Sequence, residues 1–252
     1  MQKILLASVF LTALQITAPW VVRAQVKEGK IIYERKINVH RRITDENMKN
    51  MIPEFNVSKA ELSFSSDESI YGNVKEQQDI RELAGQDNNT HIVMNFGGGD
   101  IQTYRNYATE RSVQQQDLGP KKYLIDDSLQ KQVWKLDAGT KTVKGYACKK
   151  AITHNKQGNE VIAWYTEDIQ SPSGPEVYGG LPGLILELNV NDAEIVFTAL
   201  EVITKDFDKT IVKAPSNGKK ISRAEFQKMM MQNQPGGNWS GAGGRTIQII
   251  RN

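Results

Sequence analysis

Short segments with an apolar residue at every second position recur along most of the chain, and this periodicity restricts the possible folds more than any other feature. The clearest example runs from Leu184 to Val190, where Leu186 and Leu188 continue the apolar face. Such alternation is typical of β-strands that bury one face. No helix long enough for a parallel crossover separates the segments, so we expect a mainly antiparallel sheet.

Strands are expected at residues 31–39, 60–65, 91–96, 101–107, 112–117, 122–126, 132–136, 142–153, 161–166, 184–190 and 194–203. Arg35 interrupts the apolar face of the first of these segments. Three glycines at 97–99 predict a hairpin that joins the two strands on either side of them. Turn residues at 137–139 and 155–159 predict further reversals. The strongly polar stretch 75–89 favours a mobile loop or a short solvated helix.

Two segments show helical spacing instead. The first covers 44–52 and is ended by Pro53. The second covers 222–233, where Ser222 and Glu225 have the spacing of a capping box, in which each side chain bonds a backbone amide of the other residue. Its apolar stripe consists of Phe226, Met229 and Met230.

Together these elements predict a mainly β (α+β) fold that forms one domain over residues 25–252. One or two helices should pack on the concave face of a single curved antiparallel sheet or half-open β-barrel, because apolar helix faces need a partner surface. The element order resembles that of the lipoprotein carriers LolA and LolB. A glycine-rich segment at 234–245 precedes an apolar run at 246–250. This run either adds a strand to the chain's own sheet, which we favour, or pairs with a partner.

Residues 1–24 have the features of a secretory signal peptide. Lys3 supplies a positive charge, residues 4–16 are mainly apolar, and Val22-Arg23-Ala24 ends the segment. The apolar run is too short to cross roughly 30 Å of hydrocarbon comfortably, and no longer run follows. We therefore expect cleavage after Ala24, a mature chain without a transmembrane segment, and a periplasmic or otherwise exported protein. A lipid anchor is not expected, because no cysteine stands at the cleavage site.

The single cysteine of an exported chain cannot form an intrachain disulfide. Burial as a small apolar residue is the favoured interpretation of Cys148, since unpaired cysteine is among the most buried residue types. The alternative is a hydrolase in which Cys148 is the nucleophile and His154 the base. The three histidines, at 40, 91 and 154, lie on separate segments without metal-ligand spacing.

Charge and methionine content bear on partners and cofactors. The chain has 32 Lys and Arg against 29 Asp and Glu, so its net charge of +3 does not indicate a nucleic-acid partner. Met229 and Met230 leave open a metal-handling function with a soft ion such as Cu(I). Consecutive helical residues point about 100° apart, however, which favours packing. We therefore expect no cofactor.

The hexapeptide Gly180–Ile185 reads Gly-Leu-Pro-Gly-Leu-Ile. The chain resembles the GLPGLI family of exported Bacteroidota proteins, which is named after this sequence. Further similarities are Cys148-Lys-Lys-Ala and the segments 163–166, 173–175 and 221–226. The family is of undetermined function, and its members often look like partners of TonB-dependent outer-membrane receptors. Asp127-Ser128-Leu129 also resembles the short acceptor pattern for O-glycosylation in that phylum.

The backbone properties of the hexapeptide allow two interpretations. Its glycines permit positive φ or close backbone approach, and Pro182 restricts Leu181 to an extended conformation. A structural corner before a buried strand is favoured. The alternative is a rigid apolar lip that contacts a ligand or partner. The candidate binding residues in that case are Leu181, Pro182, Gly183 and Ile185, with Trp164 and Tyr178 nearby as aromatic surfaces.

We therefore expect a non-enzymatic periplasmic or envelope protein with a binding or accessory function that works with a TonB-dependent outer-membrane transporter. Its partner would be an outer-membrane receptor or a small apolar or peptidic ligand. The alternatives are metal handling through Met229 and Met230, or hydrolysis through Cys148.

Overall fold

The computed structural model describes residues 26–74, 80–84, 90–95, 101–118, 121–232 and 246–251. The expected signal peptide, the three glycines at 97–99 and the glycine-rich segment 234–245 lie outside these residues. None of the helices in the described ranges is long and apolar enough to cross a membrane.

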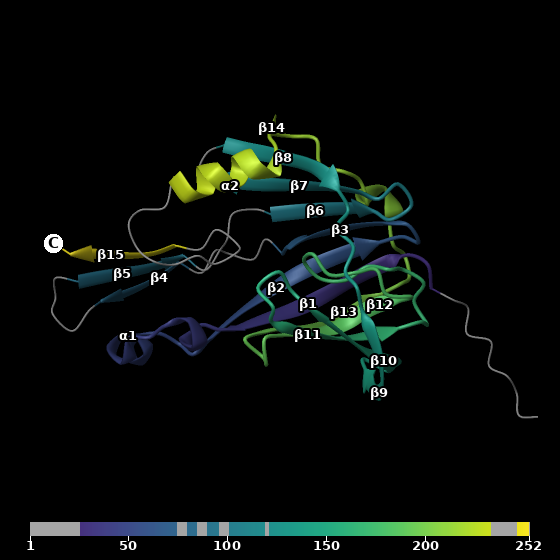
Figure 1. Ribbon diagram of the computed structural model, residues 1–252, viewed down its shortest axis with the longest axis horizontal. Helices are drawn as coiled ribbons and strands as arrows, with labels where there is room; N and C mark the ends of the chain where they lie inside the picture. Colours follow the sequence, from purple (N-terminus) through teal and green to yellow (C-terminus); the bar gives the residue numbers. More distant parts are fainter. Residues whose placement is uncertain are drawn as a thin grey trace, which may run out of the picture.

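Within these ranges, 12 strands form one sheet in the order β14-β8-β7-β6-β3-β2-β1-β13-β12-β11-β10-β9 (Figure 1). Their bounds are β1 (Gly29–Asn38), β2 (Phe55–Phe64), β3 (Glu68–Asn73), β6 (Ile101–Asn106), β7 (Arg111–Leu118), β8 (Lys121–Ser128), β9 (Lys135–Val143), β10 (Tyr146–His154), β11 (Glu160–Thr166), β12 (Leu184–Val190), β13 (Ile195–Ile203) and β14 (Lys219–Lys220). Neighbouring strands are antiparallel, except that the short β14 runs parallel to β8.

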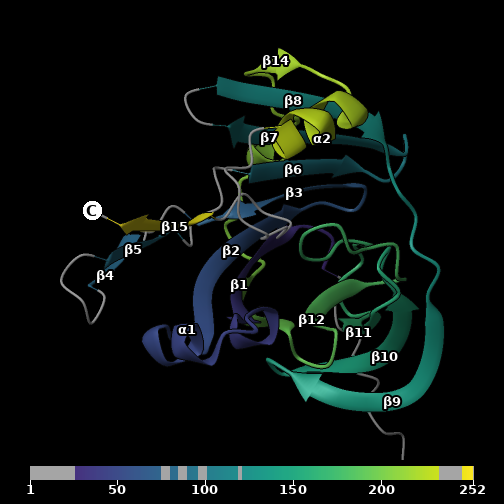
Figure 2. The same ribbon diagram turned by 60° about the vertical axis from the view of Figure 1, so that its left-hand side comes forward.

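The sheet is strongly curved but does not close into a barrel, because β14 and β9 end it as two separate edges (Figure 2). β1 is central: it pairs with β2 on one side and with β13 on the other. Its burial alternates as its sequence does, and Ile31, Tyr33 and Ile37 are at most 1% exposed. The expected curved, mainly antiparallel sheet is confirmed.

Among the described residues, two α-helices accompany the sheet, α1 (Glu46–Met51) and α2 (Arg223–Gln232), and two short 3-10 helices lie at His40–Arg42 and Lys209–Ile211. The capping box at the start of α2 is confirmed. The Ser222 amide donates to a carboxylate oxygen of Glu225 at 3.0 Å, and the Glu225 amide donates to Ser222 Oγ at 3.2 Å. The Asp45 carboxylate caps α1 by accepting from the Asn47 amide at 2.8 Å.

Both helices contact residues on one face of the sheet. The pairing registers can be followed across the sheet from Ile31 of β1, through Leu62 of β2 and Tyr71 of β3, to Ile125 of β8. These residues therefore share that face. Phe226 of α2 packs on Ile125 and on the ring of Tyr123. Beside α1, Met48, Met51 and Ile52 pack with Ile37, which shares the face of Ile31 because the two residues are an even number of positions apart in β1.

The hairpin predicted around residues 97–99 is wrong. The strand before it, β5 (Thr90–Asn95), pairs with β4 (Ile80–Ala84) and β15 (Thr246–Arg251) in a separate three-stranded sheet, whereas β6 pairs with β3 and β7. The strand β4 also contradicts the loop or helix predicted for 75–89. Strand formation depends on pairing partners distant in sequence, so the local polar composition did not reveal it. The expected intramolecular C-terminal strand is confirmed by β15.

Three local predictions between residues 132 and 153 also need correction. The strand expected at 132–136 is wrong for its first three residues, because residues 129–134 are irregular and β9 begins at Lys135. The single strand expected over 142–153 is two strands, β9 and β10, joined by a tight turn at Lys144 and Gly145, whose φ values are 50° and 81°. Positive φ at both central residues suits a two-residue hairpin turn, but lysine there provided no sequence signal. The turn expected at 137–139 lies instead inside β9, where the register with β10 shifts.

Candidate functional site

The connection between β11 and β12 lies against the inner, helix-bearing face of the sheet, and its residues 171–183 are called the inner loop below. Arg105 of β6 is 3% exposed, and its Nη1 donates to the Tyr178 carbonyl at 3.0 Å and the Gly174 carbonyl at 3.3 Å. In the sheet order β6 is separated from β12 by β3, β2, β1 and β13. The curvature of the sheet therefore brings a side chain of β6 into contact with the inner loop.

An ion pair provides a second attachment of the inner loop. Arg35 of β1 binds one carboxylate oxygen of Glu176 through Nε and Nη2, both at 2.9 Å. The Arg35 side chain is 8% exposed and the Glu176 side chain 33%. The guanidinium also lies over the Phe197 ring, 5.6 Å from its centroid. The arginine that interrupts the apolar face of β1 is therefore paired inside the molecule, which offsets the cost of burying its charge.

A phenol and an indole add two further hydrogen bonds in this region. Tyr33 Oη donates to the carbonyl of Ile185 at 2.5 Å, and Trp134 Nε1 donates to the carbonyl of Gly179 at 2.9 Å. Burial raises the pKa of Tyr33 and Tyr71 well above the ordinary tyrosine value, and it raises that of Tyr178 to about 12. These phenols therefore keep their protons at neutral pH, and that of Tyr33 acts as a hydrogen-bond donor.

The glycines of the inner loop fit positions that a larger residue cannot occupy. A Cβ at Gly183 would lie 2.1 Å from the Thr166 carbonyl oxygen, and one at Gly174 would lie 2.7 Å from Ile185 Cδ1. Gly180 has a φ of 84° and open space where a Cβ would stand, so its backbone conformation alone accounts for the glycine. The hexapeptide is thus a close backbone crossing that leads into β12.

The proposed apolar lip is not exposed as a lip would be. Leu181, Ile185 and Tyr178 are 2%, 0% and 7% exposed and belong to the main core cluster, and Gly183 is also buried. Pro182 is exposed. Trp164 is half-buried, packs against the same cluster, and its ring centroid lies 4.5 Å from Lys141 Nζ. The burial of Leu181 and Ile185 agrees with the structural corner.

Cys148 lies in the same core cluster and is 1% exposed. Burial raises the pKa of its thiol from 9.0 to about 11, and Sγ contacts the Tyr146 carbonyl oxygen at 3.6 Å. A catalytic cysteine instead needs a lowered pKa and access to substrate. His154, on the same strand, is exposed. The arrangement therefore disfavours Cys148 as a nucleophile.

The methionines do not gather at one place. Met229 and Met230 are half-buried against Tyr123, Ile125 and Phe226, whereas Met231 is 75% exposed. Met48 and Met51 belong to a different cluster, beside α1. In the part of the chain that the structure describes, no three His, Cys, Asp or Glu side chains are grouped so that they could hold a metal ion.

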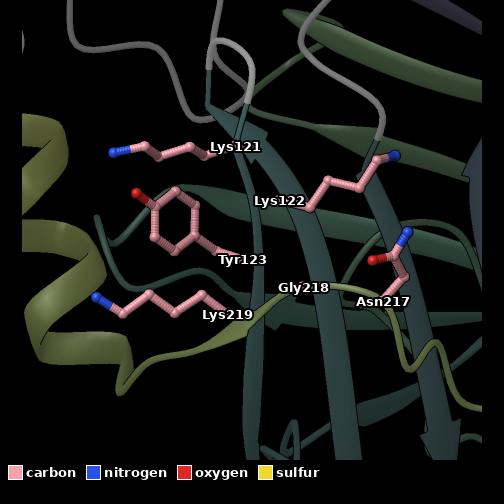
Figure 3. A pocket seen from close by; sticks show the side chains of 6 residues that line it. All are labelled: Lys121, Lys122, Tyr123, Asn217, Gly218 and Lys219. Carbon is pink, nitrogen blue, oxygen red and sulfur yellow. The ribbon is translucent and has the colours of Figure 1, made fainter.

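An open pocket of about 360 Å³ lies where β14 meets β8, and its lining residues are Lys121, Lys122, Tyr123, Asn217, Gly218 and Lys219. Figure 3 shows Lys121, Tyr123 and Lys219 extending toward α2, while Lys122 and Asn217 point the other way. Lys122 is paired with Asp117 at 3.3 Å. The sequence patterns did not reveal this pocket, nor did they single out Arg105 and Glu176. The sequence signal for these ionic contacts was Arg35, because an arginine on an apolar strand face requires a buried partner.

The comparisons with known proteins agree with this fold. Residues 64–227 match the family model described as the N-terminal domain of N-glycanase peptide, PNGase F-II. This match covers more than half of the chain, so the chain belongs to the family of PNGase F-II N-terminal domains.

Two solved structures share the architecture. The structure of PNGF-II in the C2 space group has a TM-score of 0.55 at 19% sequence identity, and that in the P21 space group has 0.55 at 18%. Each alignment covers 82% of this chain and 33% of the solved chain, so this chain spans about a third of its solved relatives. No curated protein sequence matches the chain.

Proposed function

We propose that the protein is a non-enzymatic accessory or binding protein of the bacterial envelope. The observation that carries this proposal is the family match, because the matched unit is an N-terminal domain that makes up about a third of the solved chains. The buried, high-pKa thiol of Cys148 and the core positions of the hexapeptide side chains support a scaffold rather than a reaction centre.

The envelope location rests on the signal-peptide features of residues 1–24, and the partner rests on the resemblance to the GLPGLI family. On this proposal the exported chain accompanies a TonB-dependent outer-membrane transporter. The matching domain stands at the start of a longer N-glycanase chain, which supports an accessory function beside a separate partner.

A single preparation of the protein tests both its envelope location with a partner and its non-enzymatic character. The full chain with a C-terminal tag is isolated from envelope fractions of its native host after mild cross-linking. We expect a mature protein that begins at Gln25 and carries an outer-membrane receptor with it. The purified chain is then incubated with a denatured N-glycoprotein, and we expect no release of glycans. Release of glycans at enzymatic turnover would overturn the non-enzymatic assignment, and an intact Met1 would overturn the envelope location.

A further inference from the structure

The open pocket between β8 and β14 lies where two backbone segments come close together. β14 runs parallel to β8, with Lys219 opposite Tyr123 in the pairing register. Gly218 stands just before β14 and has a φ of 148°, and a Cβ at this position would lie 3.1 Å from the carbonyl carbon and oxygen of Lys122. The glycine therefore allows the segment that carries Lys219 to lie directly against β8 at the pocket.

Three polar side chains gather on the side of the pocket that faces α2. Lys121 and Tyr123 are two residues apart in β8 and share one face of the strand, while Lys219 is the neighbour of Tyr123 on β14. Figure 3 shows all three side chains extending toward α2. Strand positions related in these ways have Cα atoms roughly 5–7 Å apart, so one small chemical group can contact all three side chains.

The tyrosine of this group is held in place by packing. Tyr123 is 7% exposed, and its ring lies edge-on to that of Phe226 in α2 at a centroid distance of 5.9 Å. Its hydroxyl forms no hydrogen bond to another described residue. The hydroxyl is therefore a positioned donor that remains available to a ligand.

The two lysines are exposed and form no ion pair with the described residues. Three carboxylates of the neighbouring strands are already paired, namely Asp117 with Lys122 at 3.3 Å, Asp126 with Arg111 at 2.8 Å and Asp127 with Arg223 at 3.0 Å. Glu225 is bonded to Ser222 in the capping box, and these bonds, with a smaller contribution from the charge of Lys219, lower its pKa. Positive charge at the pocket is thus left without a dedicated partner among the described residues.

We propose that Lys121, Lys219 and Tyr123 bind the phosphate group of a phosphate monoester. Such a group carries close to two negative charges at neutral pH and has three oxygens that accept hydrogen bonds. Two ammonium groups and one hydroxyl match it in charge and in donor groups, whereas a carboxylate has a single charge and two oxygens. The pocket of about 360 Å³ is within the size range of small-molecule sites and leaves room for the organic part of the ligand.

The test is a titration of the full chain with inorganic phosphate and with glucose 6-phosphate, followed by the amide NMR signals of residues 121–123 and 217–219. Glucose, and sodium chloride at equal ionic strength, are the references. We expect saturable shifts at these residues with both phosphate compounds and none with either reference. Shifts that do not saturate would overturn the proposal, because they would indicate only general screening of surface charge.

Substitutions of the lysines test the site directly. Lys121→Gln and Lys219→Gln should each weaken binding of inorganic phosphate roughly tenfold, and the double variant should abolish the saturable shifts. The matched control is Lys135→Gln, which removes the same charge from an exposed position on β9, at the opposite edge of the sheet. It should leave phosphate affinity unchanged. Equal weakening by Lys135→Gln and Lys121→Gln would overturn the proposal.

Tyr123→Phe keeps the ring against Phe226 and removes the hydroxyl alone. It should weaken phosphate binding several-fold without lowering Tm in chloride, because the hydroxyl has no hydrogen bond to lose within the described residues. Unchanged phosphate affinity in this variant would overturn the three-residue site.

A phosphate monoester can belong to a soluble molecule or to a lipid headgroup, and sedimentation with vesicles distinguishes the two. The vesicles are phosphatidylcholine with or without phosphatidic acid. Sedimentation that requires phosphatidic acid and is lost in the double lysine variant would assign the site to a lipid headgroup. Tighter binding of glucose 6-phosphate than of inorganic phosphate, without sedimentation, would assign it to a soluble ligand. Neither outcome depends on a receptor partner, so this proposal and the proposed function fail separately.

Discussion

At the scale of single residues, the structure explains why this fold contains glycine and arginine where a simple strand pattern would not place them. Gly183 permits the approach of the inner loop to Thr166, and Arg35 and Arg105 hold that loop by one ion pair and two carbonyl contacts. The hexapeptide spacing allowed the corner to be predicted, because proline and glycine act locally. The arginine partners depend on sheet curvature, which no local pattern encodes.

Gly183→Ala should be among the most damaging small substitutions in the chain. Its Cβ would lie 2.1 Å from the Thr166 carbonyl oxygen, so the backbone must shift. We expect a loss of roughly 3–5 kcal/mol in the free energy of unfolding. Gly180→Ala is the matched control, because Gly180 has a φ of 84° but open space where the alanine Cβ would stand. This substitution should lower the free energy of unfolding by about 1–2 kcal/mol. Urea denaturation measures both, and equal losses would contradict the close crossing.

Cys148 gives a prediction for pH dependence. Its thiol pKa is raised from 9.0 to about 11, so the folded state holds the proton more tightly than the unfolded state. The resulting stabilisation is fully present below pH 9 and is lost as pH rises toward 11. Cys148→Ala should cost on the order of 1 kcal/mol at neutral pH and show a smaller decline across that alkaline range. Rapid alkylation of the native thiol at neutral pH would contradict this account.

At the scale of elements, α2 was predictable because its start is marked by a local capping box and its apolar stripe is helical. The separate sheet of β4, β5 and β15 was only partly predictable. Alternation identified β5, and the isoleucines at 247, 249 and 250 identified β15, but their pairing joins segments far apart in the chain. Such pairings are settled by tertiary structure rather than by composition.

The packing of α2 on β8 leads to a prediction about its methionines. Phe226→Ala should cost roughly 3 kcal/mol, because the ring is 6% exposed and packs edge-on to Tyr123 at a centroid distance of 5.9 Å. The double variant Met229→Leu with Met230→Leu should change stability by less than about 1.5 kcal/mol, since volume is conserved. Met231→Ala, at an exposed position, serves as the control. Chemical denaturation measures these effects, and Cu(I) binding that the double variant abolishes would instead support metal handling.

At the scale of the whole molecule, the sheet ends at two edges, and the family relation places this architecture within longer chains. The edge strand β9 carries lysines at 135 and 141 and a register shift, features that oppose pairing with another chain. The overall class of fold followed from periodicity, because strands without crossover helices leave an antiparallel sheet as the main solution. The position of the inner loop did not follow from periodicity, because a loop inside a curved sheet depends on how the whole sheet bends.

The last prediction concerns β15, which pairs with β5 along Thr246–Arg251. Deleting residues 244–252 removes these backbone hydrogen bonds and leaves β5 with β4 as its remaining neighbour in the small sheet. An unpaired strand edge is less stable and prone to association, so Tm should fall by several degrees and light scattering should increase at high protein concentration. Calorimetry and static light scattering measure the two effects. An unchanged Tm, together with loss of a co-purifying envelope partner, would instead assign the C-terminal strand to docking.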